Sequence, residues 1–475
     1  MRNLCAAGLL VLMLAPLGWG QDAADRFQRD MQQIQRETQA RFDADLPPAQ
    51  RALIDYGGYL TLGYLSFDDA AHDNHGLREY ELVGYGRINI DGAQEIYFRG
   101  RADYDNYNSG DSFDRQPDHL EGRVEEGWYR FDLQRYLSVY QGRTIQNDLS
   151  VKAGRQFVDW GNGLTLDQYV DGVAAEIRGQ HLSLDLLACA TVKETIDFDI
   201  TRPEFDGNTR RGYYGARLTG QIGRHYPYAY FLLERDYNRA ESPITHIVPT
   251  RYRYNSYYAG GGSNGSLSDN LAYGVEACFE GGSGLSNSIN PANNEPITQT
   301  DDRIEAYAAN LRLDYLLNDR RKTRFGAEFL IASGDRDRML ASGTFSGNKP
   351  HTSDLAFNSL GVIYDGLAFA PSVSNLVMLR FAASTYPVPT GALRGLQLGA
   401  AFFVFGKALQ DAAIDEPSAN RHYLGCEPDL SVNWQIVDDV SFALRYGLFF
   451  PGDAIPSGDQ NHVRQFLYAA VTYAF

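Results

Sequence analysis

The feature that most constrains this chain of 475 residues is an alternation of apolar and polar side chains that starts near Tyr56 and continues to the last residue. Successive side chains of a β-strand point to opposite faces, so a two-residue period predicts strands with one apolar and one polar face. Ile96 and Phe98 share one face, for example, and Arg99 and Arg101 share the other. We therefore expect an all-β fold. About eighteen such runs follow one another, near 56–66, 78–90, 94–105, 122–131, 149–157, 171–178, 180–190, 211–222, 226–236, 252–262, 269–279, 303–315, 322–333, 374–384, 394–407, 422–434, 438–449 and 463–475.

The connections between these runs alternate between short and long. On an even strand count, this alternation puts every long loop at one end of the sheet and both chain ends at the other. That layout is typical of a transmembrane antiparallel β-barrel of the bacterial outer membrane, which we predict over 52–475 with about 18 strands (16–18). The short links are Asp91–Ala93, Arg178–Gln180, Gly223–His225, Asn318–Asp319 and Val437–Asp439, and the long polar ones include the segment 334–373.

The two faces of the strands indicate which solvent each one meets. A barrel of this size is too wide to be filled by side chains, so its charged face is expected to line a water-filled lumen while its apolar face meets lipid. Aromatic residues make up 13% of the chain and suit the two interfacial girdles of such a barrel. The net charge of −17 argues against a nucleic-acid partner, which would require a basic surface.

The first 48 residues differ from the rest. Residues 1–20 combine Arg2 with an apolar core and small residues before Gln21, which predicts a secretory signal peptide. Residues 21–48 form the one long helical pattern, which Pro47 ends, and we expect a short periplasmic helix there. Two interpretations stay open: a solvated leader helix, or a helix that forms a coiled coil or docks on or inside the protein. The second would allow an oligomer or a peptidoglycan contact through this helix.

Several stretches resemble one protein family, the alginate-export porins. They are "GRQFVDWGNG" (154–163), "FLIASGDRD" (329–337), "LGVIYDGLAFAPSVSNL" (360–376), "LGCEPDLSVNW" (424–434) and "GLFFPGDA" (447–454), with a weaker match at "EEGWYRFDL" (125–133). The resemblance covers roughly 125–475. It implies an eighteen-stranded outer-membrane barrel that passes an anionic uronate polysaccharide through an arginine-lined constriction.

The chain departs from the family pattern at four places. Ala443 stands where a basic residue is expected, and Glu125 and Asp365 stand where arginines are expected. The long periplasmic turn that is thought to act as a plug is reduced to 435–439. Because charges at the narrowest point set electrostatic selectivity, these carboxylates predict a lumen of mixed charge.

Strand alternation selects the candidate pore-lining residues. Arg155 is ambiguous, because strict alternation from Val151 turns it outward unless Gly154 marks a bulge. For any one residue, an alternative role is to brace the barrel through ion pairs. The candidates are Arg87, Arg99, Arg101, Asp103, Lys152, Arg155, Arg217, Arg312, Arg380, Glu427, Asp429 and Arg445, with Asp314 facing the same space.

Signals for other chemistry are weak. The mature chain has three widely spaced cysteines, which predict neither a disulfide framework nor a metal site. The stretches "SGDRDR" and "DSFD" offer clustered oxygens but lack the glycine and terminal glutamate of an EF-hand loop. The nine histidines show no pairing with a serine nucleophile. We therefore expect no catalytic residues, no enzyme activity, no metal and no cofactor.

The end of the chain, "QFLYAAVTYAF", fits a closing strand. Its apolar face, which ends at Phe475, is expected to meet membrane lipid or lipopolysaccharide, and pairing with the first strand would close the barrel. A terminal aromatic residue resembles the signal read by the outer-membrane assembly machinery. The predicted function is a passive channel for hydrophilic solutes or for export of a polysaccharide. The alternative is a structural or attachment barrel that anchors the envelope or surface partners.

Overall fold

The computed structural model describes residues 52–108, 111, 118–192, 210–237, 251, 253–290, 295–338, 348–456 and 458–475. The predicted signal peptide (1–20) and the helix predicted within 21–48 lie outside these ranges. All statements below concern the described residues.

Eighteen antiparallel strands form one closed sheet, in which every strand pairs with its neighbours in the chain and the last pairs with the first. This confirms the predicted all-β barrel and each of the eighteen predicted runs. A small hairpin, β12 (Ile289–Asn290) and β13 (Glu295–Pro296), lies outside the wall. The wall consists of β1 (Ala52–Asp68), β2 (Asn74–Ile90), β3 (Gln94–Tyr107), β4 (Asp118–Asp132), β5 (Asp148–Trp160), β6 (Leu166–Arg178), β7 (Leu182–Thr191), β8 (Arg211–Gly220), β9 (His225–Asp236), β10 (Tyr254–Ser266), β11 (Leu271–Leu285), β14 (Asp301–Leu316), β15 (Arg324–Ala332), β16 (Leu376–Thr385), β17 (Leu396–Lys407), β18 (Tyr423–Val437), β19 (Val440–Pro451) and β20 (Arg464–Ala474).

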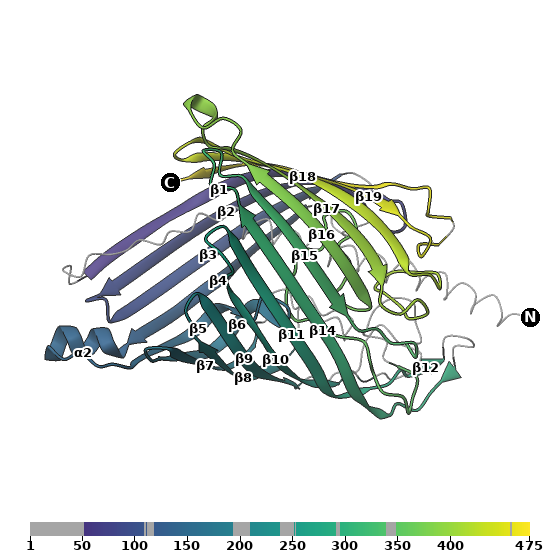
Figure 1. Ribbon diagram of the computed structural model, residues 1–475, viewed down its shortest axis with the longest axis horizontal. Helices are drawn as coiled ribbons and strands as arrows, with labels where there is room; N and C mark the ends of the chain where they lie inside the picture. Colours follow the sequence, from purple (N-terminus) through teal and green to yellow (C-terminus); the bar gives the residue numbers. More distant parts are fainter. Residues whose placement is uncertain are drawn as a thin grey trace, which may run out of the picture.

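The connections separate into a short-turn end and a long-loop end. In Figure 1 the C-terminus and α2 (Leu133–Gln141) lie at the left, short-turn end, and β12 lies at the opposite end. All five predicted short links are at the short-turn end. Helix α2 was not predicted, and it replaces a plain turn between β4 and β5. Asp132 caps its first turn by accepting a hydrogen bond from the Arg135 N–H at 2.8 Å, and Gly142 ends it in the left-handed conformation.

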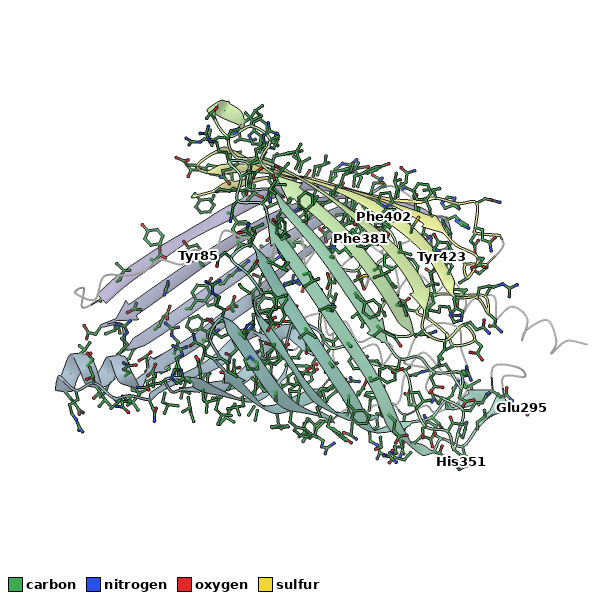
Figure 2. The ribbon with its side chains drawn as sticks, in the orientation of Figure 1. Tyr85, Glu295, His351, Phe381, Phe402 and Tyr423 are labelled. Atoms are coloured by element: carbon green, nitrogen blue, oxygen red, sulfur yellow. The ribbon has the colours of Figure 1, made fainter. Side chains whose placement is uncertain are left out.

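The outer face of the barrel is apolar, as the alternation predicts. Phe381 and Phe402 are paired across β16 and β17, and both side chains are exposed on the outer wall (Figure 2). Leu467, Val471 and Tyr473 of the closing strand β20 are on this outer face too. None of the helices in the described ranges is long and apolar enough to cross a membrane.

The buried core lies inside the barrel rather than between two layers. It consists of inward-facing side chains of the wall packed against parts of the chain that fold into the lumen. Glycines on the inner face of β10 make room for large neighbours. A Cβ at Gly260 would come within 2.3 Å of the Tyr230 ring, and one at Gly262 within 2.6 Å of the Tyr228 hydroxyl.

Candidate functional site: a constricted, charged lumen

Two segments fold from the long-loop end into the lumen and meet there. We call Asp354–Asn375 the constriction segment and Trp160–Leu166 the hairpin tip. Leu166 and Leu360 form a parallel bridge, in which the Asp167 N–H donates to the Leu360 carbonyl at 3.2 Å. The Ser359 hydroxyl donates to the Leu164 carbonyl at 2.6 Å. The two segments therefore form one constriction inside the barrel.

This arrangement corrects one expectation from the sequence. The segment 334–373 was predicted as a long polar external loop, whereas its second half is buried in the lumen. Phe357, Leu360 and Phe369 have no exposed surface. An apolar run in a loop has to find a partner surface, and here the inner wall supplies it.

The hairpin tip leaves the wall because pairing between β4 and β5 stops early. The two strands are paired only from Asp132–Ser150 to Gly127–Arg155. Beyond that pair, β5 and β6 continue together into the lumen, where Trp160 packs against the Tyr230 ring with 6.3 Å between centroids.

Three buried glutamates of the wall hold the backbone of the two segments. The Asn162 N–H donates to Glu276 at 2.6 Å, and the Asn358 N–H donates to Glu280 at 2.8 Å. Glu427 of β18 accepts from three successive backbone N–H groups of the constriction segment. None of the three glutamates has exposed surface. The three donors to Glu427 are Leu367 at 2.5 Å, Ala368 at 2.8 Å and Phe369 at 2.9 Å.

Aromatic packing fixes the same segment against β17 and β19. The Phe369 ring stacks on Phe449 at 4.2 Å with a 5° angle between planes, and it meets Phe405 edge-on at 5.1 Å. At the other end of the segment, Phe357 meets Tyr258 edge-on at 6.1 Å. The segment is therefore held by two separate parts of the wall.

Arginines line the lumen between the constriction segment and the short-turn end. Asp314 is flanked by Arg324 at 2.7 Å and Arg312 at 3.5 Å, and Glu95 is flanked by Arg130 at 2.5 Å and by Arg87. Each group has two guanidinium groups for one carboxylate, which leaves one positive charge in excess.

A pocket of about 280 Å³ lies against β14–β19 below the constriction segment. Arg380 lines it, pairs with Glu328 at 3.1 Å and lies 4.7 Å from the centre of the Tyr364 ring. Tyr364 belongs to the constriction segment and donates its hydroxyl hydrogen to Asp429 at 2.7 Å. Arg312, Arg324 and Arg445 line the same pocket.

Another part of the wall, on β2–β4, carries a compact acidic cluster around Arg101. Ligand oxygens of Glu79, Glu81 and Asp103 lie within 4.8 Å of one another, which is close enough to hold a cation. The Arg101 guanidinium lies against all three at 3.5, 3.8 and 2.5 Å. Glu125 lies 3.4 Å from Arg101. The four carboxylates outnumber the guanidinium groups of Arg99, Arg101 and Arg123 that they contact, so this cluster is an acidic part of the lumen lining.

The sequence had selected only part of this cluster. Arg99, Arg101 and Asp103 were candidates. Arg99 pairs with Glu125 at 2.7 Å and donates to the Tyr59 hydroxyl at 2.8 Å. Glu79 and Glu81 were missed, although their alternation with Tyr80 places both on the inner face.

The remaining candidates on the inner wall are separate from one another. Lys152 lies 4.3 Å from the centre of the Trp128 ring. Arg217 pairs with Asp185 at 2.9 Å. Arg445 is buried and donates to the Leu444 carbonyl at 3.0 Å.

Arg155 is the exception among the candidates, because the structure places it on the outer face. The pairing register through β5 and β6 is continuous, although Gly154 has a φ of 127°. Arg155 therefore lies opposite Gly127 and Asp171, in the row that contains the outward-facing Phe98. Strict alternation is the correct prediction here, and Arg155 does not line the lumen.

Asp354 ties the start of the constriction segment to the long-loop end of the barrel. Burial raises the pKa of its carboxyl group, and the nearby Arg338 guanidinium opposes that rise. Arg338 donates two hydrogen bonds to Asp354, at 2.8 and 2.9 Å. The Asp354 N–H also donates to the Arg303 carbonyl at 2.7 Å, which anchors the segment to β14.

A closed barrel of eighteen strands with an apolar outer face and a charged lumen defines a class, the outer-membrane channels of bacteria. Within that class, the chain belongs to the alginate-export family, whose model matches residues 68–468 under the description "Alginate export". The family segments 154–163, 360–376, 424–434 and 447–454 all contribute to the constriction. No curated protein matches the chain.

Solved structures share the fold at low sequence identity. Pseudomonas aeruginosa OccK7 (OpdD) is 13% identical, with a TM-score of 0.52 over 89% of this chain and 98% of that one. Pseudomonas aeruginosa OccK11 (OpdR) is 11% identical, with a TM-score of 0.51 over 90% and 99%. Acinetobacter baumannii OccAB3 is 12% identical, with a TM-score of 0.50 over 89% and 99%. These likenesses show the fold alone.

Proposed function

We propose that the protein is a passive channel that favours anionic hydrophilic solutes, including acidic saccharides. The observation that carries this proposal is the unequal exposure of opposite charges in the lumen. Arg312 and Arg324 are each 51% exposed, whereas Asp314, which they flank, is 15% exposed. A solute in this part of the lumen therefore meets guanidinium groups before carboxylates.

The chemistry of these groups suits a carboxylated solute. A guanidinium group binds a carboxylate through two parallel hydrogen bonds, and Arg remains charged at any physiological pH. Because Asp314 already neutralises part of the charge, each arginine would bind a passing carboxylate weakly. Several weak sites in series allow entry without trapping, which conduction requires.

Ion selectivity tests this proposal. In a planar bilayer with a KCl gradient, the wild type is expected to show a reversal potential on the anion-selective side. Arg312→Gln with Arg324→Gln should lower the ratio of anion to cation permeability roughly 2- to 5-fold, since exposed ionic interactions contribute about 0.2–1 kcal/mol each. The control is Arg303→Gln, which removes an exposed arginine from the outer face of β14. An unchanged ratio in the double variant contradicts the assignment.

The apolar packing of the constriction segment and the hairpin tip inside the barrel supports a second candidate, a closed barrel that anchors the envelope or surface partners. The absence of ion current in correctly folded protein would favour this second function. Blockade of the current by an oligouronate, and not by a neutral oligosaccharide of equal length, would instead support passage of an acidic polysaccharide.

A further inference from the structure

Exposed arginines gather on the outer face of the barrel, where β8, β9 and β10 reach the long-loop end. Arg235 is the last but one residue of β9, and Arg253 directly precedes β10. Arg210 directly precedes β8, and its carbonyl accepts a hydrogen bond from the Tyr237 N–H at 2.8 Å, so the pairing of β8 with β9 continues to this residue. All three arginine side chains are exposed. We call Arg210, Arg235 and Arg253 the arginine patch.

The strand register makes the three arginines neighbours on one face. Arg235 lies opposite Gly212 of β8, and Arg210 is two residues further along that chain segment. The register of β9 and β10, extended by two residues, sets Arg235 opposite Asn255, which is two residues from Arg253. Arg235 is therefore the diagonal neighbour of both other arginines. Diagonal neighbours in a sheet are roughly 7–8 Å apart, so two of these long side chains can reach one group between them.

The patch carries positive charge that its surroundings do not balance. Arg253 pairs with Asp301, and these two side chains are 44% and 48% exposed. Among the residues that the structure describes, no carboxylate pairs with Arg235. The adjacent outward pair Arg303–Glu305, at 2.7 Å, is neutral and adds no net charge. Arg235 therefore places an uncompensated guanidinium group beside two others, and an anion at this position would relieve the repulsion between them.

Aromatic side chains indicate the depth of the patch in the membrane. Phe231, Phe279 and Tyr307 share one outward-facing row across β9–β14 and are 47%, 42% and 56% exposed. Such exposed aromatic rows mark the membrane interfaces of outer-membrane barrels. Arg235 is four residues beyond Phe231, which is roughly 10 Å further along the membrane normal for a tilted strand. The patch therefore lies at headgroup depth, at the end that bears the long external loops.

We infer that the arginine patch binds the phosphate groups of lipopolysaccharide in the outer leaflet of the membrane. Lipopolysaccharide carries phosphates on the sugars of its lipid A part, directly above the acyl chains. Guanidinium groups bind phosphate through paired, charge-assisted hydrogen bonds, and Arg235 with either diagonal neighbour can contact one phosphate from two sides. The aromatic row below the patch offers apolar surface to the acyl chains. This surface lies outside the lumen, so the inference does not depend on the proposed channel function.

Binding of purified lipid A to the full-length protein in mild detergent, followed by native mass spectrometry, tests this inference. The wild type is expected to retain diphosphorylated lipid A. Arg235→Gln with Arg253→Gln should lower the bound fraction roughly tenfold, because charge-assisted contacts to phosphate are lost. Arg235→Lys with Arg253→Lys keeps the charge without the forked geometry and should give an intermediate bound fraction.

Arg78→Gln is the matched control. Arg78 is an exposed arginine near the same end of β2 and donates to Asn106 at 3.0 Å, away from the patch. This variant should bind lipid A like the wild type. Heat-modifiable migration in SDS gels verifies that each variant is folded.

Three results would overturn the inference. The first is a wild type that retains no lipid A, and the second is a double glutamine variant that binds as much lipid A as the wild type. The third is equal binding of lipid A from which the phosphates have been removed, because acyl chains alone would then account for the binding.

Discussion

Individual carboxylates hold the lumen in shape, and Glu427 does so with the most contacts to one segment. Its two oxygens accept hydrogen bonds from Leu367, Ala368 and Phe369. Gly366 beside it has a φ of 107°, and a Cβ there would lie only 3.0 Å from the Glu427 carboxylate. A side chain at 366 would therefore be strained and would crowd the carboxylate.

Replacing this carboxylate should loosen the constriction. Glu427→Gln puts an amide donor where backbone N–H groups already point, so about 1–3 kcal/mol of local stabilisation is lost. We expect higher single-channel conductance and more current noise, with the barrel still folded. Glu305→Gln on the outer face is the matched control. A Glu427→Gln channel with wild-type conductance would contradict this role.

Arg101 offers a second test at the scale of one residue. Arg101→Ala leaves Glu79, Glu81, Asp103 and Glu125 together without the central cation, and breaking such a buried network costs about 3–5 kcal/mol. Urea unfolding followed by tryptophan fluorescence should show a lower midpoint for this variant. Millimolar Ca²⁺ should partly restore the midpoint, because the cation would neutralise the clustered carboxylates in place of Arg101. A change below about 1 kcal/mol would mean that the cluster does not depend on Arg101.

Alternation predicts which way a strand residue points but not what it contacts. It places Glu427, Asp429 and Arg445 toward the lumen, as the structure has them. The partners of Glu280 include the backbone of Asn358, which is 78 residues away in the chain, and no local pattern contains that pairing.

At the scale of elements, the two inward-folded segments depend on close backbone approach. A Cβ at Gly361 would lie 1.7 Å from the Gly163 carbonyl oxygen, so the constriction segment and the hairpin tip can touch only if residue 361 is glycine.

Gly361→Ala should therefore separate these two segments. We expect the conductance to rise and the apparent melting temperature to fall, because the Ser359–Leu164 and Leu360–Asp167 bonds are strained or lost. Gly86→Ala is the control, since a Cβ at Gly86 would meet nothing within 4 Å. If both variants behave like the wild type, the segments do not meet as described.

The strands were predictable because their two-residue period is long and regular. The inward folding was not, because a long connection carries no period to show on which side of the wall it lies. The run from Val362 to Val373 is too apolar for a solvated loop, and that composition is the one signal available in the sequence. Helix α2 had a similar local signal in its cap at Asp132.

At the scale of the whole molecule, the chain has a net charge of −17, yet arginines are exposed in the lumen near the short-turn end. The barrel wall separates the lumen from the outer surface and the loops. The net charge of the whole chain therefore does not determine which charges a solute meets in the lumen. Because β20 pairs with β1 and closes the barrel, a solute can pass between the two ends of the barrel only through the lumen. The constriction then sets the size of the path, and the arginines set its charge preference.

Single-channel recording of the folded wild-type protein in a planar bilayer under a KCl gradient tests this account most directly. The account predicts discrete conductance steps and a reversal potential on the anion-selective side. A folded protein that gives no steps, or one whose reversal potential lies on the cation-selective side, would contradict it.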